Sequence, residues 1–197
     1  MPLEDIRPIK SELRNRYKAL RRNMDSAFKE SCDETIAQRV SGLWQYAKNR
    51  RLFTYVSTAI EVDTRRIIEK ALEDGKTVAV PRCVPGTRTM EFYAISSLQE
   101  LRPGSFGVLE PEPDPKKLWT DFSEGLCLVP ALCYDWKGFR LGYGKGYYDR
   151  FLSKYRGANI GVCYNVCLKP LLPHGRYDKM VNVLVTEKFV KRPQPKS

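Results

Sequence analysis

The segment Leu126-Cys127-Leu128-Val129 contains no polar residue, and a proline follows it. A strand that is apolar on both faces has to be covered on both faces, which is typical of the centre of a parallel sheet. Parallel neighbours are joined by long crossovers that usually contain a helix. This one segment therefore predicts an α/β fold in which helices cover a mostly parallel sheet.

The rest of the chain shows the alternation that such a fold needs. Two helices are expected first, at residues 4–23 and 28–46, because apolar residues recur there at helical spacing. Residues 51–56, 64–74 and 77–80 then read as a strand, a helix closed by Gly75 and a second strand, which is a βαβ unit. Further strands are expected at 90–95, 126–130, 160–164 and 181–186, with a helix at 147–155. We expect a single layered domain over residues 1–197, with a mostly parallel sheet flanked by helices.

The charge of the chain indicates an anionic partner. Its 34 Lys and Arg residues outnumber 23 Asp and Glu residues, giving a formal charge of +11. Such an excess suits either a nucleic acid or a polyanionic substrate. No apolar run approaches the ~20 residues of a membrane span, and the first residues lack the pattern of a secretory signal. We therefore expect a cytoplasmic protein with no membrane partner.

Cysteine and histidine usage excludes two common kinds of site. The six cysteines form no C-x-x-C pair, which disfavours structural zinc. His174 is the only histidine, so a histidine-dependent triad has almost nothing to be built from. The chemistry has to come from other residue types.

The most informative segment for function is residues 138–150, which holds four glycines, one lysine and two arginines just before an expected helix. Glycines let backbone N–H groups approach an oxyanion, the helix N-terminus adds unpaired donors, and Lys145 adds a mobile charge. The spacing matches neither a Walker loop nor a dinucleotide fingerprint, since Gly146 follows Lys145. We interpret the segment as a phosphate-binding loop with a nucleotide as the leading ligand. The alternative is a flexible surface turn with incidental charge.

Two other places carry charged residues that suit a site. Lys10 and Arg14 lie four residues apart in the first expected helix, although the pattern alone favours a solvated cationic surface over a site. Glu61 and Asp63 lie in the first βα loop, at the carboxyl end of a strand, where open α/β sheets bind ligands. The alternative for both acids is that they only favour the positive end of the next helix.

Taken together, these segments resemble the 5-formyltetrahydrofolate cyclo-ligase family, also called methenyltetrahydrofolate synthetases. The resemblance covers nearly the whole chain, and its most specific part is the glycine-rich block. It rests on Lys10-x-x-x-Arg14, Glu61-Val62-Asp63-Thr64, Val80-Pro81-Arg82, Phe106-Gly107-Val108-x-Glu110-Pro111, the block from Arg140 to Asp149, and Tyr177-Asp178.

The resemblance implies an enzyme that uses ATP and Mg²⁺ to convert 5-formyltetrahydrofolate to 5,10-methenyltetrahydrofolate, releasing ADP and phosphate. Phosphorylation of the formyl oxygen makes it a leaving group, and N10 of the folate then closes the ring. The protein's task is positioning and charge neutralisation, with no covalent enzyme intermediate. The implied partners are the folate and ATP, with no nucleic acid, and a monomer is expected.

The resemblance also implies roles for individual residues. The catalytic residues would be Lys145, Arg14 and Tyr148, and the metal ligands would be Asp149 and Asp178. The ATP-binding residues would be Lys10, Arg14, Arg140, Leu141, Gly142, Tyr143, Gly144, Lys145, Gly146, Tyr147 and Tyr148. The folate-binding residues would be Arg14, Thr58, Glu61, Asp63, Gly144, Tyr147 and Tyr148. Two positions depart from the family pattern, with Tyr143 where some members have arginine and Asn182 where an acid often stands.

Two rival functions remain open at this point. A nucleic-acid-binding protein would use the basic first helix, and its affinity would fall steeply with salt. A kinase acting on another small molecule would share the glycine loop and need no folate pocket.

Overall fold

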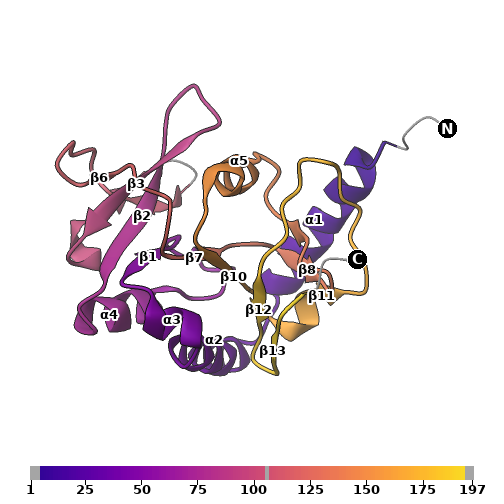
Figure 1. The fold of residues 1–197 in the computed structure, drawn as a ribbon. Coiled ribbons are helices and arrows are strands. Elements are labelled where there is room, and N and C mark those ends of the chain that lie inside the picture. The colour runs from indigo at the N-terminus through magenta and orange to yellow at the C-terminus, as the bar shows by residue number, and fades with distance from the viewer. Residues whose placement is uncertain (1–4, 105–106, 194–197) are drawn as a thin grey trace.

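The computed structural model describes residues 5–104 and 107–193, and it shows an α/β fold built on one large mixed sheet (Figure 1). Within these residues the sheet has eight strands in the order β13-β12-β10-β7-β1-β2-β3-β6. The five strands from β12 to β2 are mutually parallel, and antiparallel strands lie only toward the two edges. The strands are β1 Arg51–Phe53, β2 Thr77–Cys83, β3 Met90–Ile95, β6 Leu118–Trp119, β7 Leu126–Val129, β10 Ala158–Val162, β12 Val183–Val185 and β13 Val190–Lys191. The prediction of a mostly parallel sheet flanked by helices is confirmed.

Strand β7 lies at the centre, as its composition predicts. All four of its residues are at most 1% exposed, and it pairs in parallel with β1 on one side and β10 on the other. Helix α4, Arg65–Glu73, connects β1 to β2, and helix α5, Tyr147–Lys154, lies between β7 and β10. Both crossovers are βαβ units, so the carboxyl ends of β1 and β7 share one edge of the sheet.

Helices cover both faces of this sheet. Helices α2, Ser26–Ser41, and α3, Trp44–Lys48, lie with α4 along one side, and α5 lies on the other (Figure 1). Beneath α5, Phe151 contacts Phe92 with ring centres 4.6 Å apart, and Phe53 of β1 packs edge-on against Phe92 at 5.4 Å. Because strand side chains alternate, the neighbouring Leu52 faces the opposite layer. The core is therefore continuous across the sheet.

The first helix, α1, Arg7–Arg22, buries the stripe Leu13, Tyr17 and Arg21. The single helix expected at 28–46 is instead two, because α2 ends at Gly42 and the chain is extended at Leu43 before α3 begins. Asp25 caps the start of α2, since its carboxylate accepts the N–H of Phe28 at 2.8 Å.

Strand β2 is longer than expected and continues through Pro81. Phe53 of β1 pairs with Ala79, and β1 ends there, so among the described strands residues 80–83 pair only with β3. On the free side a proline removes no ladder hydrogen bond, which is why the strand tolerates it. The result is a β2–β3 hairpin that projects beyond the sheet (Figure 1).

Short strands build two small sheets that the sequence pattern does not reveal. Strands β8, Cys133–Asp135, β9, Arg140–Leu141, and β11, Leu168–Lys169, form a three-stranded sheet, while β4, Arg102–Pro103, pairs with β5, Leu109–Glu110. Asp135 closes the β8–β9 turn, since its Oδ1 accepts the N–H groups of Lys137 and Phe139. The glycine loop therefore starts from a hairpin rather than from a long loop. Among the described residues, no helix is long and apolar enough to cross a membrane.

Candidate active site

The glycine loop joins β9 to α5 and adopts backbone conformations that need glycine. Gly144 has φ of +101° and Gly146 has φ of +73°, both in the region that side chains rarely adopt. A Cβ at Gly144 would lie only 3.2 Å from the Arg14 guanidinium carbon. The missing side chain is thus what lets Arg14 lie against the loop.

Helix α1 brings Arg14 to this loop and Lys10 to the segment that contains Asp178. Arg14 Nε donates to the carbonyl of Gly142 at 2.9 Å. One turn earlier, Lys10 Nζ pairs with Asp178 Oδ2 at 2.5 Å, and both side chains are largely buried. The alternative of a merely solvated helix surface is wrong for these two residues, because both are held in tertiary contacts.

Arg140 and Asp149 form a partly buried ion pair at the base of the loop. Arg140 Nη2 lies 2.7 Å from Asp149 Oδ1, and its side chain is only 4% exposed. Its Nη1 donates to the carbonyl of Lys179 at 2.7 Å, and the Lys179 N–H donates to Asp149 at 3.2 Å. Arg140 therefore ties the loop, α5 and the 175–179 segment together.

The two predicted metal ligands meet at that same segment. Gly175 N–H donates to Asp178 Oδ2, while Asp149 is bound by the adjacent Lys179. The hydrogen bonds found among the described residues leave Asp178 Oδ1 and Asp149 Oδ2 unused. No group of three or more His, Cys, Asp or Glu residues in the described ranges could hold a metal alone. Two carboxylates, each with one oxygen to give, fit an ion such as Mg²⁺ whose other ligands are water and substrate phosphates.

Asn182, at the position noted above, is engaged elsewhere. Its Oδ1 accepts the N–H of Asn159 at 3.0 Å, and its N–H donates to Asn159 Oδ1 at 2.8 Å. The amide therefore joins the starts of β10 and β12, and its oxygen is committed there instead of being offered to a metal.

The βα loop after β1 separates its two acids. Glu61, 7% exposed, folds back so that Oε2 accepts the N–H of Thr58 at 2.8 Å and its hydroxyl at 2.9 Å. Asp63 instead accepts the Ser57 hydroxyl at 2.7 Å and the N–H of Arg65, the first residue of α4, at 3.1 Å. Asp63 thus contacts the start of α4, whereas Glu61 does not.

Tyr143 connects the glycine loop to this second loop. Partial burial and the nearby Glu61 carboxylate raise the pKa of the Tyr143 phenol, which also lies beside Thr58. Lys18 Nζ sits 5.6 Å from the centre of its ring. The predicted ATP-binding loop and the predicted folate-binding loop therefore face each other across Tyr143.

The two tyrosines that begin α5 point to different places. Tyr147 Oη lies 3.5 Å from the carbonyl of Thr87 in the β2–β3 hairpin. The hydroxyl of Tyr148 is buried and has no hydrogen-bond partner among the described residues. Burial raises the pKa of Tyr148 well above its usual value, and nearby Cys127 and Glu61 add to this effect. Its phenol is therefore a neutral donor with no acceptor.

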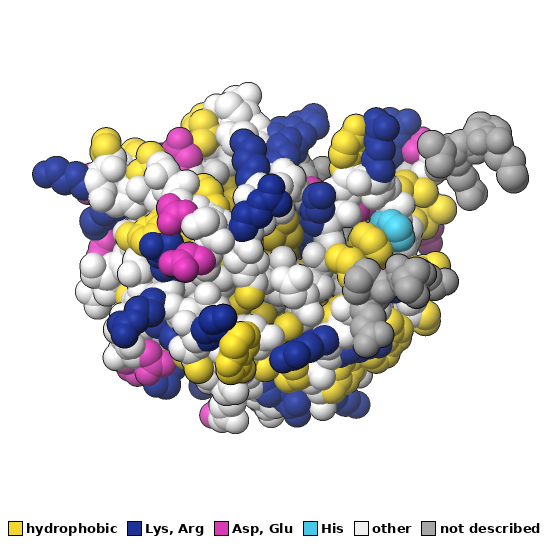
Figure 2. Space-filling view, viewed as in Figure 1, with side chains coloured by type: hydrophobic (Ala, Val, Ile, Leu, Met, Phe, Trp, Pro, Cys, Tyr) yellow, Lys and Arg dark blue, Asp and Glu magenta, His cyan; other side chains and the backbone are white. Residues whose placement is uncertain are grey.

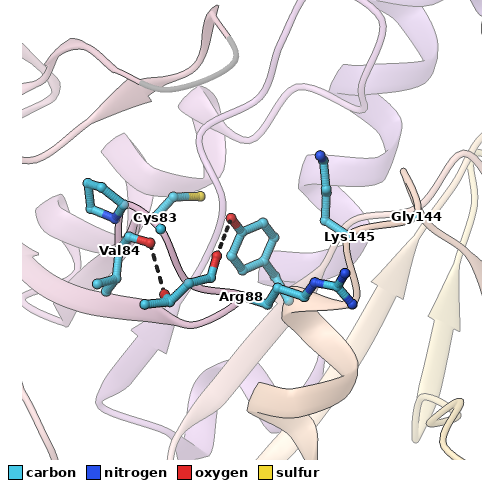
Figure 3. Close-up of a pocket in the computed structure, with 9 residues that line it drawn as sticks. Cys83, Val84, Arg88, Gly144 and Lys145 are labelled. Atoms are coloured by element: carbon cyan, nitrogen blue, oxygen red, sulfur yellow. Dashed lines mark hydrogen bonds between the residues drawn. The ribbon is translucent and has the colours of Figure 1, made fainter.

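A cavity of about 530 Å³ lies between the glycine loop and the β2–β3 hairpin (Figure 3). Figure 3 shows Arg88 extending from the hairpin towards the loop that carries Gly144 and Lys145. Lys and Arg side chains also gather on this side of the molecule, at the top of Figure 2. The cavity is lined by Cys83, Val84, Pro85, Gly86, Thr87, Arg88, Gly144, Lys145 and Tyr147.

Sequence reasoning misses the hairpin wall of this cavity. The turn signal Pro85-Gly86 was available, but nothing in the pattern shows that β2 and β3 project towards residues nearly sixty positions later. Of the family segments quoted above, Phe106 lies outside the described residues.

Known proteins are similar to this chain in both sequence and fold. A family model described as the 5-formyltetrahydrofolate cyclo-ligase family matches residues 6–187. A Caenorhabditis elegans protein named probable 5-formyltetrahydrofolate cyclo-ligase is 33% identical over 157 residues, covering 76% of this chain and 75% of that protein. A Saccharomyces cerevisiae 5-formyltetrahydrofolate cyclo-ligase is 29% identical over 201 residues, covering 89% of this chain and 94% of that protein. The NMR structure of Aquifex aeolicus 5,10-methenyltetrahydrofolate synthetase aligns with a TM-score of 0.79 at 30% identity, covering 96% of this chain and 95% of that chain.

These similarities include the parts of the chain that build the site. The matched range begins at the start of α1 and continues past β12, so it contains the glycine loop, the βα loop and the hairpin. The protein therefore belongs to the 5-formyltetrahydrofolate cyclo-ligase family of enzymes.

Proposed function

We propose that the protein converts 5-formyltetrahydrofolate to 5,10-methenyltetrahydrofolate while hydrolysing ATP to ADP and phosphate. One observation carries the proposal beyond family membership. A loop suited to phosphates, with Arg14 and Lys145, lies near a loop that presents the polar pair Thr58 and Glu61, and helix α1 contacts both loops through Arg14 and Arg21. The reaction needs an anionic nucleotide and a polar heterocycle held side by side, and this juxtaposition supplies both surfaces.

The proposed chemistry has two steps. The formyl oxygen attacks the γ-phosphorus of ATP, the bond to the β-phosphate oxygen breaks, and ADP leaves. N10 then attacks the formyl carbon, the carbon–oxygen bond breaks, and inorganic phosphate departs with the former formyl oxygen. The N10 proton is lost to solvent as the methenyl bridge forms. Both steps move negative charge between phosphate oxygens, so fixed positive groups are the main catalytic requirement.

Lys145 and Arg14 are proposed to neutralise the transferred phosphoryl group. Gly142, Gly144 and Gly146 allow the loop backbone to come close to the phosphates, as the left-handed conformations at 144 and 146 support. Arg88, on the opposite wall of the cavity, adds a cation that sequence reasoning did not include. Arg140 is proposed to act indirectly, because its pair with Asp149 fixes the base of the loop.

On the folate side, Glu61 and Thr58 are the proposed contacts, and Asp63 shapes the loop by holding the start of α4. Tyr148 is the proposed hydrogen-bond donor to a substrate oxygen, since its neutral hydroxyl has no acceptor within residues 5–104 and 107–193. Asp149 and Asp178 are the proposed ligands of Mg²⁺. When bound, the ion would neutralise phosphate charge.

The decisive experiment mixes purified protein with 5-formyltetrahydrofolate and Mg-ATP and follows the near-ultraviolet absorbance of methenyltetrahydrofolate. We expect absorbance to grow only when both substrates are present, with one ADP released per product. No product, together with RNA binding that weakens steeply with salt, would establish the nucleic-acid alternative. ADP release that requires another small molecule as the phosphate acceptor, with no ADP released in the presence of the folate, would establish the kinase alternative.

Three further expectations accompany this proposal. The chain from 1 to 197 is proposed to fold as one domain, to be monomeric, and to work in the cytoplasm without nucleic acid. Light scattering of the purified protein tests the oligomeric state, and a single cooperative unfolding transition tests the domain assignment.

A further inference from the structure

The loop that presents Glu61 is held from beneath by buried side chains. The carbonyl of Ile60 accepts Arg21 Nη1 of α1 at 3.1 Å. The next carbonyl, that of Glu61, lies 2.9 Å from the Tyr164 hydroxyl, and that of Val62 accepts the Tyr55 hydroxyl at 2.9 Å. Consecutive peptide groups are therefore bound by donors from separate parts of the fold.

A buried carboxylate completes this arrangement. Asp33 of α2, 4% exposed, accepts the Tyr164 hydroxyl at 2.7 Å and the N–H of Asp63 at 3.0 Å through the same oxygen. Its other oxygen pairs with Lys29 at 2.6 Å. Since a phenol has one proton, Tyr164 shares it between Asp33 and the Glu61 carbonyl. The hydroxyl thus links α2 to the loop.

The loop depends on these contacts because it has little regular structure of its own. Between β1 and α4, one backbone–backbone hydrogen bond within the loop is found among the described residues. It runs from the Glu61 N–H to the Thr58 carbonyl at 3.1 Å. The Glu61 side chain bonds back to Thr58 as well. The direction of Glu61 is therefore determined by its own turn and by the groups beneath its carbonyl.

We propose that Tyr164 is a positioning residue for the folate side of the site, acting through the backbone of Glu61. Its side chain is fully buried, so it acts on the loop from within the fold and not on the substrate directly. Removing its hydroxyl should let the peptide after Glu61 rotate, so that the carboxylate no longer sits where folate needs it. This inference rests on the proposed function, since it assumes that Glu61 faces the folate.

Tyr164→Phe tests the proposal, because it keeps the ring and removes only the hydroxyl. We expect the KM for 5-formyltetrahydrofolate to rise about tenfold, with the KM for ATP changed less than about twofold. The control is Tyr46→Phe, which removes a hydroxyl from another buried tyrosine, where it is bonded to the Asp74 carboxylate at 2.7 Å and lies away from the loop. That variant should lose stability without changing either KM.

A second measurement does not need catalysis. Hydrogen exchange of residues 58–63 should be faster in Tyr164→Phe than in wild type, and unchanged in Tyr46→Phe. Asp33→Asn, which keeps the side-chain shape and weakens the same link, should act in the same direction. Equal shifts in the two KM values, or unchanged exchange in the loop, would overturn the positioning role. If wild-type protein forms no methenyl product, the proposed function fails, while the exchange result still decides whether Tyr164 orders the loop.

Discussion

The orphan hydroxyl of Tyr148 makes a prediction in which stability and activity move in opposite directions. The change is Tyr148→Phe, which removes one oxygen from a buried position on α5. A hydroxyl buried without a partner loses its bonds to water and gains nothing in return. Its removal should therefore stabilise the empty protein, provided that the ring stays in place against Phe151.

The size of the effect follows from that desolvation. Leaving a polar group buried and unpaired costs about 1–3 kcal/mol. If Tyr148→Phe removes about 1–2 kcal/mol of this cost, the melting temperature of a 197-residue chain should rise by about 2–8 °C. If the hydroxyl serves a substrate oxygen, kcat/KM should fall by about 10–100-fold, because a donor aimed at developing charge is lost.

Tyr155 at the end of α5 provides the control, because its hydroxyl is also buried and has no partner in the described part of the chain. Tyr155→Phe should raise the melting temperature by a similar amount and leave kcat/KM unchanged. Calorimetry without ligands and the absorbance assay on all three proteins complete the comparison. A Tyr148→Phe protein that is less stable than wild type would refute the premise, and one that is more stable and fully active would remove Tyr148 from the mechanism.

Four other changes test separate parts of the site. Lys145→Ala should lower kcat/KM by at least ~10²-fold, about 2.7 kcal/mol of transition-state stabilisation, and near-normal turnover would exclude the residue from phosphoryl transfer. Asp178→Ala should raise the free Mg²⁺ concentration needed for half-maximal rate, so an unshifted titration would mean that the ion binds elsewhere. Arg88→Gln should raise the KM for ATP about tenfold, whereas a rise only for the folate would assign that wall of the cavity to the glutamate carboxylates. Burial and the neighbouring Glu110 raise the pKa of Cys83, so alkylation of its thiol should be slow at neutral pH and accelerate as the pH rises. Cys83→Ser should keep full turnover, because the proposed chemistry needs no thiol. Loss of turnover in a folded Cys83→Ser protein would contradict this.

The parts of the fold that could be predicted are those with a strong local signal. An apolar run such as β7 can only be buried on both faces, and the glycine loop needs the permissive residues that it contains. The ends of the helices and strands were harder to predict. Gly42 ends α2 where apolar spacing continues, and β2 extends through Pro81 only because β1 stops first. The extension of β2 depends on where β1 ends, and no local sequence pattern in β2 indicates this.

The candidate site could be predicted as a set of residues but not as a set of pairs. Each role carried over from the family concerned one position, whereas Arg140 and Asp149 act as a pair joined across nine residues. Asp63 and Glu61 are two positions apart, yet one binds a helix start and the other binds its own turn. Such partnerships arise from tertiary distance, which spacing along a chain does not encode.

The ion pair between Lys10 and Asp178 joins positions separated by 168 residues, and it has a consequence for how the protein is made. During synthesis, α1 leaves the ribosome long before the segment that holds its partner. The carboxylate that completes the pair is made only after the strands up to β11 have been synthesised. A nascent chain therefore carries Lys10, one of the proposed ATP-binding cations, without this counter-charge until the segment around Asp178 has been made.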